Sequence, residues 1–221
     1  MTPPASPAGN PTAAEEPVTL PATVVTLTDS DLSSSAQRKR RRRILDATLA
    51  LASKGGYDAV QMRAVAERAD VAVGTLYRYF PSKVHLLVAA LGREFERIDS
   101  KRRGPLGDTP HRRMHTLLGQ ITRSMQRDPL LTEAMTRAFM FADASAAAEV
   151  DRVGRFMDRM FAQAMRGDDE EPTERQLAIA RVISEVWLSN LVAWITRRSS
   201  PSDVAARLDL AVDLLLGDSS E

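Results

Sequence analysis

Apolar residues recur along most of the chain with the spacing of an amphipathic helix. In the first such stretch, a stripe with the i, i+1, i+4, i+5, i+8 pattern is formed by Ile44, Leu45, Thr48, Leu49 and Ala52. No segment alternates with the period of two that a half-buried strand needs, and aromatic residues make up only 5% of the chain. The pattern therefore predicts an all-α protein.

Glycines and prolines that interrupt this pattern divide it into about nine helices. The predicted helices span roughly residues 37–54, 61–68, 73–79, 81–99, 110–126, 129–142, 145–166, 173–198 and 201–216. The cluster of Gly104, Pro105, Gly107 and Pro110 is the clearest domain boundary in the chain. We therefore expect an N-terminal domain over residues 37–103 and a second domain over residues 104–221. Because six of the twelve prolines fall within the first 21 residues, without helical periodicity, residues 1–36 are expected to form a disordered tail.

Charge is distributed unevenly over these parts, although the 221 residues have a net charge of only +1. Residues 1–37 have a net charge of −4; residues 38–103 hold 16 basic and 7 acidic side chains, a net charge of +9. Residues 104–221 hold 14 basic and 18 acidic side chains, a net charge of −4. Such asymmetry suggests that the N-terminal domain meets an anionic partner.

Several functional classes are excluded or disfavoured by composition. The chain has no cysteine, which excludes disulfides, thiolate catalysis and cysteine-based zinc sites. We see no apolar run near the ~18 residues that span a bilayer and no basic segment leading into an apolar one, so we expect a cytoplasmic protein. No phosphate-binding glycine loop or catalytic side-chain set is evident, and we predict neither an enzyme nor a cofactor. His111 and His115 are four residues apart, but without a further ligand nearby they do not predict a metal site.

The sharpest functional signal lies between Tyr57 and Leu86. Here two short helices meet at a tight turn around residues 69–71. Apolar side chains spaced to form one small core are Met62, Val65, Ala66, Val71, Leu76 and Phe80. This arrangement predicts a helix-turn-helix, whose second helix fits the major groove of DNA.

We expect the exposed side of that second helix to contact DNA. Small residues bring the backbone close to base edges, methyl groups of Val73 and Thr75 can touch thymine, and the Tyr77 and Tyr79 hydroxyls can reach phosphate, as can Lys83. The basic run 38–43 is expected to contact phosphate or the minor groove, with a solvated helix end or a membrane-surface helix as alternatives. The predicted DNA-binding residues are Arg38, Arg41, Gln61, Arg63, Ala72, Val73, Gly74, Thr75, Tyr77, Arg78, Tyr79 and Lys83.

This segment resembles the DNA-binding domain of the TetR family of bacterial repressors. The positions that match the family signature are Val65, Ala66, Gly74, Thr75, Leu76, Tyr77, Tyr79, Phe80, Ser82, Lys83 and Leu86. The chain departs from the signature at Asp70, where the family usually has a turn glycine, and at Val60 and Gln61, where it usually has a Ser or Thr helix cap. Gln61 is therefore free to reach phosphate instead.

The resemblance implies a homodimeric repressor that binds a palindromic operator, keeps an effector pocket after the DNA reader and dimerises through its last two helices. Residues 53–99, 128–149 and 180–198 further resemble actinobacterial members that repress cholesterol and lipid catabolism genes. That likeness implies a coenzyme A thioester of a sterol catabolite as effector. From the residues alone, the alternative is an α-helical lipid-binding protein or enzyme whose basic end docks on membranes.

The second domain is rich in soft apolar side chains. Seven of the nine methionines lie between residues 114 and 165, with four phenylalanines among them and two tryptophans beyond. Such side chains suit an apolar cavity for a bulky ligand, and they equally suit a plain core. Asn190 is a polar group that can pair with a ligand carbonyl or with a neighbouring helix. The predicted effector-binding residues are Met114, Leu118, Met125, Met135, Phe139, Phe156, Met160, Trp187, Asn190 and Trp194.

Overall fold

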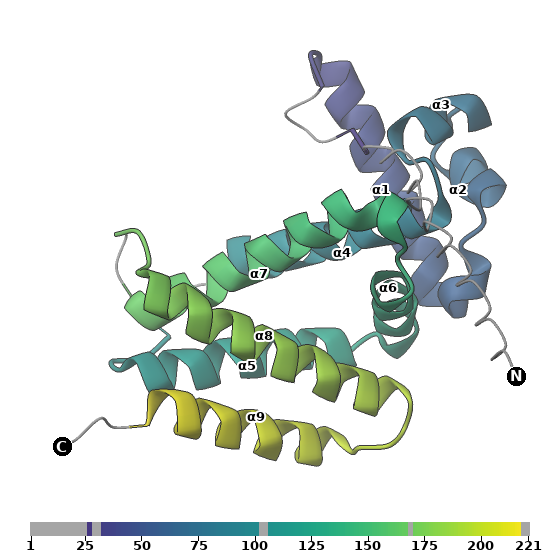
Figure 1. The fold of residues 1–221 in the computed structure, drawn as a ribbon. Coiled ribbons are helices and arrows are strands. Elements are labelled where there is room, and N and C mark those ends of the chain that lie inside the picture. The colour runs from purple at the N-terminus through teal and green to yellow at the C-terminus, as the bar shows by residue number, and fades with distance from the viewer. Residues whose placement is uncertain (1–25, 28–31, 102–105, 168–169, 218–221) are drawn as a thin grey trace, which may run out of the picture.

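The computed structural model describes residues 26–27, 32–101, 106–167 and 170–217. These ranges are helical and contain no strand, which confirms the all-α prediction (Figure 1). The α-helices are α1 (Ser35–Ala59), α2 (Met62–Arg68), α3 (Val73–Tyr79), α4 (Lys83–Ser100), α5 (Pro110–Gln126), α6 (Pro129–Met140), α7 (Ala147–Arg166), α8 (Glu174–Ile195) and α9 (Pro201–Leu216), with one 3₁₀ turn at Ala144–Ala146.

Side-chain caps explain why most of these helices begin where they do. In each case a hydroxyl or carboxylate oxygen accepts a backbone N–H of the first turn, which would otherwise lack a partner. The capping residues are Ser34, Ser82, Thr109, Asp128, Thr173 and Ser200, and a proline follows three of them. Because such signals are local, the predicted and observed starts of these helices agree to within about two residues.

The first helix differs from its prediction at Gly55 and Gly56. Gly56 takes a positive φ of 64° and Gly55 is also non-helical, yet one further helical turn continues to Ala59. The glycine pair therefore kinks α1 rather than ending it. Backbone angles of this kind are open to glycine at little cost, and Gly56 packs against Leu130 of α6.

The small helices α2 and α3 lie beside α1 at one end of the molecule, and α5, α8 and α9 lie at the other (Figure 1). Helix α4 leaves the α1–α3 group and contacts both α6 and α7. Helix α6 also packs along α1, so the two ends are joined by α4 and α6 together.

The described part of the expected tail is packed onto the protein. The backbone N–H of Thr26 donates to Glu149 Oε1 at 2.8 Å, Leu32 is buried, and α1 already begins at Ser35. Thr26 and Leu32 thus make ordered contacts within the expected tail, which composition could not indicate because such contacts join residues far apart in sequence. The other residues of that segment, 1–25 and 28–31, lie outside the described ranges.

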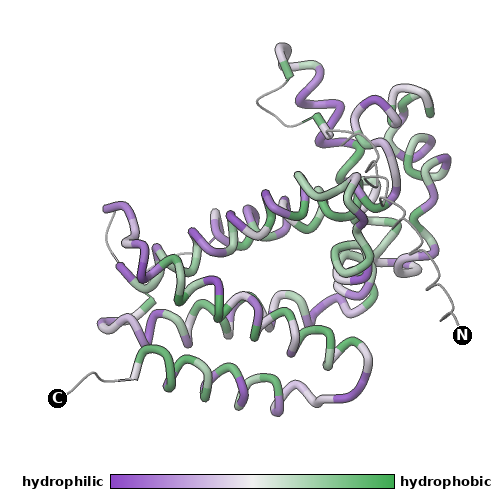
Figure 2. The backbone as a smooth tube through the Cα atoms, viewed as in Figure 1, coloured by the Kyte–Doolittle hydropathy of each residue, from purple (hydrophilic) through white to green (hydrophobic). Residues whose placement is uncertain are grey.

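Helices α8 and α9 carry apolar side chains on more than one face. Figure 2 shows α9 as hydrophobic along much of its length, and Leu210 and Leu214 are 57% and 77% exposed. In the described part of the chain, α8 alone is long and apolar enough, by length and composition, to cross a membrane, but it packs between α7 and α9. Val204, Leu208 and Val212 of α9 are buried within the chain itself.

Candidate DNA-binding surface and ligand pocket

Helices α2 and α3 are held at a fixed angle by a tight turn. The N–H of Val71 donates to the Ala66 carbonyl at 3.0 Å, and Asp70 takes a left-handed φ of 52°. Asp70 thus adopts the conformation that a turn glycine would supply, at a modest cost for an aspartate. Its carboxylate lies 3.4 Å from Arg43 of α1, which ties the turn to the first helix.

The packed sides of the two helices form the predicted small core. Val65, Ala66, Leu76 and Phe80 are at most 1% exposed, and Met62 and Val71 pack against them partly buried. This burial fixes the rotation of α3 about its axis. The opposite side of α3 is therefore left open to solvent.

That open side, with Ala72 before it and Thr75 at its edge, holds half of the residues predicted to touch DNA. Val73 and Tyr77 are 36% and 48% exposed, and Arg78 is exposed near the end of the helix. Ala72 is also exposed, and a Cβ added at Gly74 would meet no atom within 4 Å. Thr75 is half-buried at the edge of this surface. Because Ala72 and Gly74 have little or no side chain, another molecule can approach the backbone closely on this side of α3.

Tyr79 does not belong to this surface. Its ring is only 2% exposed, and its hydroxyl donates to the Gln37 carbonyl of α1 at 3.5 Å. Positions three and four apart share one face of a helix, so Tyr79 lies with Leu76 on the buried side. In this structure Tyr79 packs α3 against α1, so a contact from its hydroxyl to DNA stays a prediction that requires the ring to move.

Lys83 lies at the start of α4, against a tyrosine ring. Its ammonium group is 3.7 Å from the ring centroid of Tyr57, and the Arg137 guanidinium is 4.4 Å from the same centroid. Partial burial lowers the pKa of Lys83, and the nearby Asp58 carboxylate opposes that shift. The Tyr57 ring therefore holds the Lys83 ammonium group in place, and the side chain does not extend into solvent.

The basic run at the start of α1 divides into two groups. Arg38 donates to the Leu32 carbonyl and Arg41 to the Leu27 carbonyl, both at 2.9 Å, so these two predicted DNA contacts hold the preceding segment. Lys39 and Arg42 are exposed and Arg40 is half-buried; their side chains make no hydrogen bond or ion pair within the described ranges. Gln61 precedes α2 without a capping bond from its side chain, and Gln61 and Arg63 are both exposed.

A cavity of about 540 Å³ lies between α4, α6, α7 and α8. Its lining is mainly apolar and comprises Leu91, Phe95, Thr136, Phe139, Val150, Asp151, Val153, Gly154, Arg155, Met157, Asp158, Arg181, Ser184, Glu185, Trp187, Leu188 and Leu191. This size is within the ~300–1,000 Å³ usual for small-molecule sites. The charged members are mostly exposed and mark the mouth, where Arg155 pairs with Asp151 at 3.8 Å and Arg181 with Asp158 at 3.6 Å.

One buried hydroxyl in this lining has no partner. Thr136 is 1% exposed, and its Oγ1 makes no hydrogen bond within the described residues. Trp187, by contrast, is fully engaged: its ring stands edge-on to Phe95 with centroids 5.8 Å apart, and its Nε1 donates to Thr122 Oγ1 at 3.2 Å. The cavity thus has mainly apolar walls, and one of its lining residues, Thr136, carries a buried hydroxyl without a partner among the described residues.

The cavity shares only Phe139 and Trp187 with the predicted effector-binding set. The other predicted residues do not line it: Met114, Leu118, Met125, Met135 and Met160 are core side chains, Phe156 and Trp194 border separate surface hollows, and Asn190 donates to the Val186 carbonyl of its own helix. Sequence reasoning missed the wall of α7, where Val150, Val153 and Met157 follow i, i+3, i+7 spacing. That spacing marks an apolar face, but it does not say whether the face meets a side chain or a void.

Comparison with known proteins gives two family matches. Residues 44–90 match the family described as "Bacterial regulatory proteins, tetR family", and residues 107–215 match "Tetracyclin repressor-like, C-terminal domain". The chain is 77% identical over 195 residues to the HTH-type transcriptional repressor KstR of Rhodococcus jostii, covering 88% of this chain and 91% of that protein.

Solved structures agree with these matches. A TetR transcriptional regulator from a Rhodococcus species is 35% identical, with a TM-score of 0.74 over 84% of this chain and 99% of that one. FadR of Thermus thermophilus, a TetR-family repressor in complex with lauroyl-CoA, is 20% identical, with a TM-score of 0.59 over 82% of this chain and 96% of that one. The second likeness concerns the fold alone.

Proposed function

The chain belongs to the TetR family of bacterial regulatory proteins and is a ligand-responsive transcriptional repressor rather than an enzyme, and from this premise we propose which DNA and which ligand it binds. It acts in the cytoplasm as a homodimer on a pseudo-palindromic operator of cholesterol and lipid catabolism genes. A steroid coenzyme A thioester releases it from that operator. The observation that carries the ligand assignment is the apolar cavity, whose lining includes Thr136 with a hydroxyl that has no partner among the described residues.

Support for a dimer comes from the last two helices. Val182 of α8 and Leu210 and Leu214 of α9 are 43%, 57% and 77% exposed, a large apolar surface for a monomer to leave in water. Pairing α8 and α9 with those of a second copy covers these side chains. A twofold dimer then presents two α3 helices to successive major grooves, which is how helix-turn-helix dimers read palindromic sites.

Support for a steroid comes from the shape and chemistry of the cavity. A rigid, apolar ring system suits walls made of Leu91, Phe95 and Val153, and a ring oxygen can accept a hydrogen bond from the Thr136 hydroxyl once that buried side chain turns toward the cavity. The phosphates of coenzyme A need water and basic side chains; at the mouth these are Arg155 and Arg181, which would have to exchange their ion pairs with Asp151 and Asp158 for the phosphates. The Thermus FadR complex with lauroyl-CoA indicates that the same fold houses an acyl-CoA.

Release from DNA follows from the position of the cavity. Its walls include α4 and α6, the two helices that join the ligand domain to α1–α3. A ligand that spreads these walls tilts the two readers, so both α3 helices no longer fit one operator. The ligand must bind the DNA-incompetent state more tightly, and a ~100-fold preference corresponds to about 2.7 kcal/mol of coupling.

The test is a DNA-release titration on the purified protein. The operator is first selected from a random DNA pool, and binding is followed by fluorescence anisotropy with excess competitor DNA. We expect a cholesterol-derived CoA thioester to release the operator, while free coenzyme A and the free steroid acid do not. Equal release by lauroyl-CoA would contradict the steroid assignment. Vesicle binding without any selected DNA sequence would contradict the repressor itself and favour the membrane-docking alternative.

A further inference from the structure

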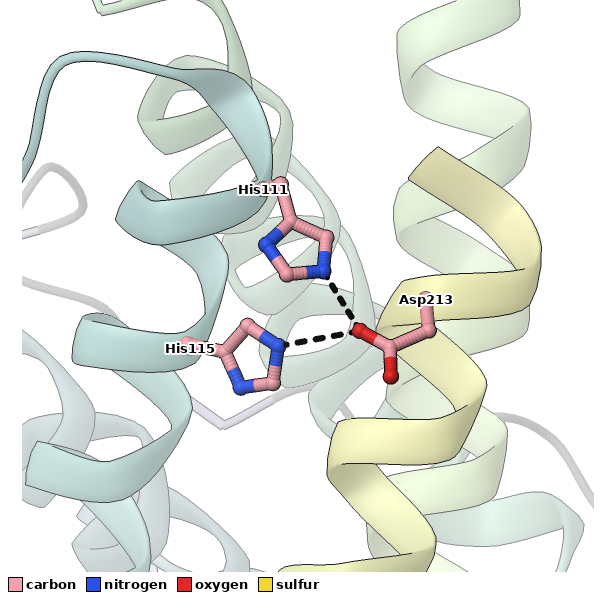
Figure 3. Close-up of side chains that lie close together, drawn as sticks. All are labelled: His111, His115 and Asp213. Carbon is pink, nitrogen blue, oxygen red and sulfur yellow. Dashed lines mark hydrogen bonds and ion pairs between the residues drawn. The ribbon is translucent and has the colours of Figure 1, made fainter. Parts of the chain in front are cut away.

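Two histidines of α5 and two aspartates of α9 converge outside the DNA surface and the ligand cavity. His111 and His115 are one helical turn apart, and both point toward Asp213 on the facing helix (Figure 3). His111 Nε2 lies 2.5 Å and His115 Nε2 lies 3.4 Å from the same oxygen, Asp213 Oδ1. The donor atoms of these three residues lie within 4.8 Å of one another.

Asp209 determines which nitrogen of His115 faces this cluster. Its Oδ1 lies 2.6 Å from His115 Nδ1, and since a carboxylate only accepts, Nδ1 carries the hydrogen. In the neutral ring, Nε2 then has a free lone pair directed at the Asp213 oxygen, which is also an acceptor. Two acceptors face one another unless a proton or a metal ion lies between them.

We propose that His111, His115 and Asp213 bind one divalent transition-metal ion of the zinc class, with Asp209 orienting His115 through its other ring nitrogen. The donor set is two imidazole nitrogens and one carboxylate oxygen, which suits Zn²⁺, Co²⁺ or Ni²⁺ better than Mg²⁺ or Ca²⁺. A carboxylate behind a ligating histidine is the usual outer partner of such sites. Water completes the coordination, because the histidine side chains are 36% and 27% exposed.

The observed separations are close to those that coordination needs. Bonds of ~2.0–2.1 Å at tetrahedral angles place ligand atoms about 3.3 Å apart. The 3.4 Å from Asp213 Oδ1 to His115 Nε2 matches this spacing, whereas the 2.5 Å to His111 Nε2 is a hydrogen-bond distance that must lengthen by roughly 0.8 Å through side-chain rotation. The metal joins the first turns of α5 to the last turns of α9, whose neighbouring residues Leu210 and Leu214 are exposed. The metal ion therefore holds α9 against α5.

The site is tested with tag-free, full-length protein and Zn²⁺ as the probe. Calorimetry is expected to give one Zn²⁺ per chain, and Co²⁺ is expected to give visible absorption bands of a nitrogen- and oxygen-ligated ion. A hundredfold excess over Kd is expected to raise Tm by roughly 5–10 °C. If the wild-type protein takes up none of Zn²⁺, Co²⁺ and Ni²⁺, the proposal is overturned.

Variants locate the site. His111→Ala, His115→Ala and Asp213→Asn should each abolish the metal-induced Tm shift, while Asp209→Asn should weaken binding 10–100-fold. The matched control is Asp108→Asn, an exposed carboxylate near the start of α5 outside the cluster, which should bind as wild type does. Each shift is measured from that variant's own metal-free Tm, so a change in basal stability is not mistaken for lost binding. Uptake that is equal in all variants would overturn the assignment.

Discussion

Replacing Thr136 by valine should make the ligand-free protein more stable and the liganded complex weaker. Valine keeps the shape and β-branching of threonine, so helix propensity barely changes, but it lacks the hydroxyl. Thr136 Oγ1 is buried without a hydrogen-bond partner among the described residues. Burying such a group costs about 1–3 kcal/mol, which the valine avoids.

The expected magnitudes follow from these contacts. At about 2–4 °C per kcal/mol for a chain of this size, Thr136→Val should raise the ligand-free Tm by several degrees. A hydrogen bond between neutral groups contributes about 0.5–1.5 kcal/mol, so losing the bond to a steroid oxygen should weaken thioester binding roughly 2–12-fold. Stability and affinity are thus expected to change in opposite directions.

Thr132 on the same helix is the matched control. It is equally buried at 1% exposure, but its Oγ1 donates to the Met125 carbonyl at 2.6 Å. Thr132→Val should therefore lower the ligand-free Tm by about 2–4 °C and leave thioester affinity unchanged. The assays are thermal unfolding without ligand and calorimetric titration with the thioester. The reasoning is refuted if Thr136→Val lowers Tm as Thr132→Val does, or binds the thioester as wild type does.

Three further predictions concern the DNA reader and the last helix. Lys83→Ala should weaken binding to every DNA sequence alike and reduce the slope of log affinity against log salt by about 1; a changed preference at a single base pair would count against a phosphate contact. Leu76→Ala, at a fully buried position, should destabilise the protein by about 2–5 kcal/mol in denaturant unfolding, and a loss under 1 kcal/mol would show the reader core to be loose. Hydrogen bonds from the Ser200 hydroxyl and then its backbone N–H lower the pKa of Asp203 from its ordinary 3.8, so its stabilisation of α9 is present above that value and lost as pH falls through the lower folded-state pKa. Asp203→Asn should therefore flatten the acid limb of the stability curve, and an unchanged limb would contradict the cap.

The helix-turn-helix was the part most open to prediction from sequence. Val65, Ala66 and Leu76 are neighbours in one short segment, and their spacing alone indicates that they share a core. Tyr77 and Tyr79 have identical chemistry, and only their position around the helix separates the exposed ring from the buried one. The three-residue spacing from the buried Leu76 indicates that Tyr79 lies on the buried side of α3, whereas the chemistry of the tyrosine side chain does not.

The cavity borders both predicted domains, since Leu91 and Phe95 of α4 line it, and most of its walls are not the residues chosen from the sequence. The methionines that drew attention, such as Met114 and Met135, are core residues, and a face of α7 with Val150 and Val153 borders the void instead. Both sets are apolar at helical spacing. Which set lines a void depends on how four helices pack together. The sequence of one helix shows its apolar face but not what that face will meet.

The sequence by itself determined the helices, their caps, the turn at Asp70 and the basic charge of the reader, because all of these depend on residues a few positions apart. Only the tertiary structure decided which apolar faces enclose a cavity, and that His111 and His115 meet Asp213 from 102 and 98 residues away. The physical reason is that helical periodicity says which face of a helix is buried. It does not say which other helix that face will meet.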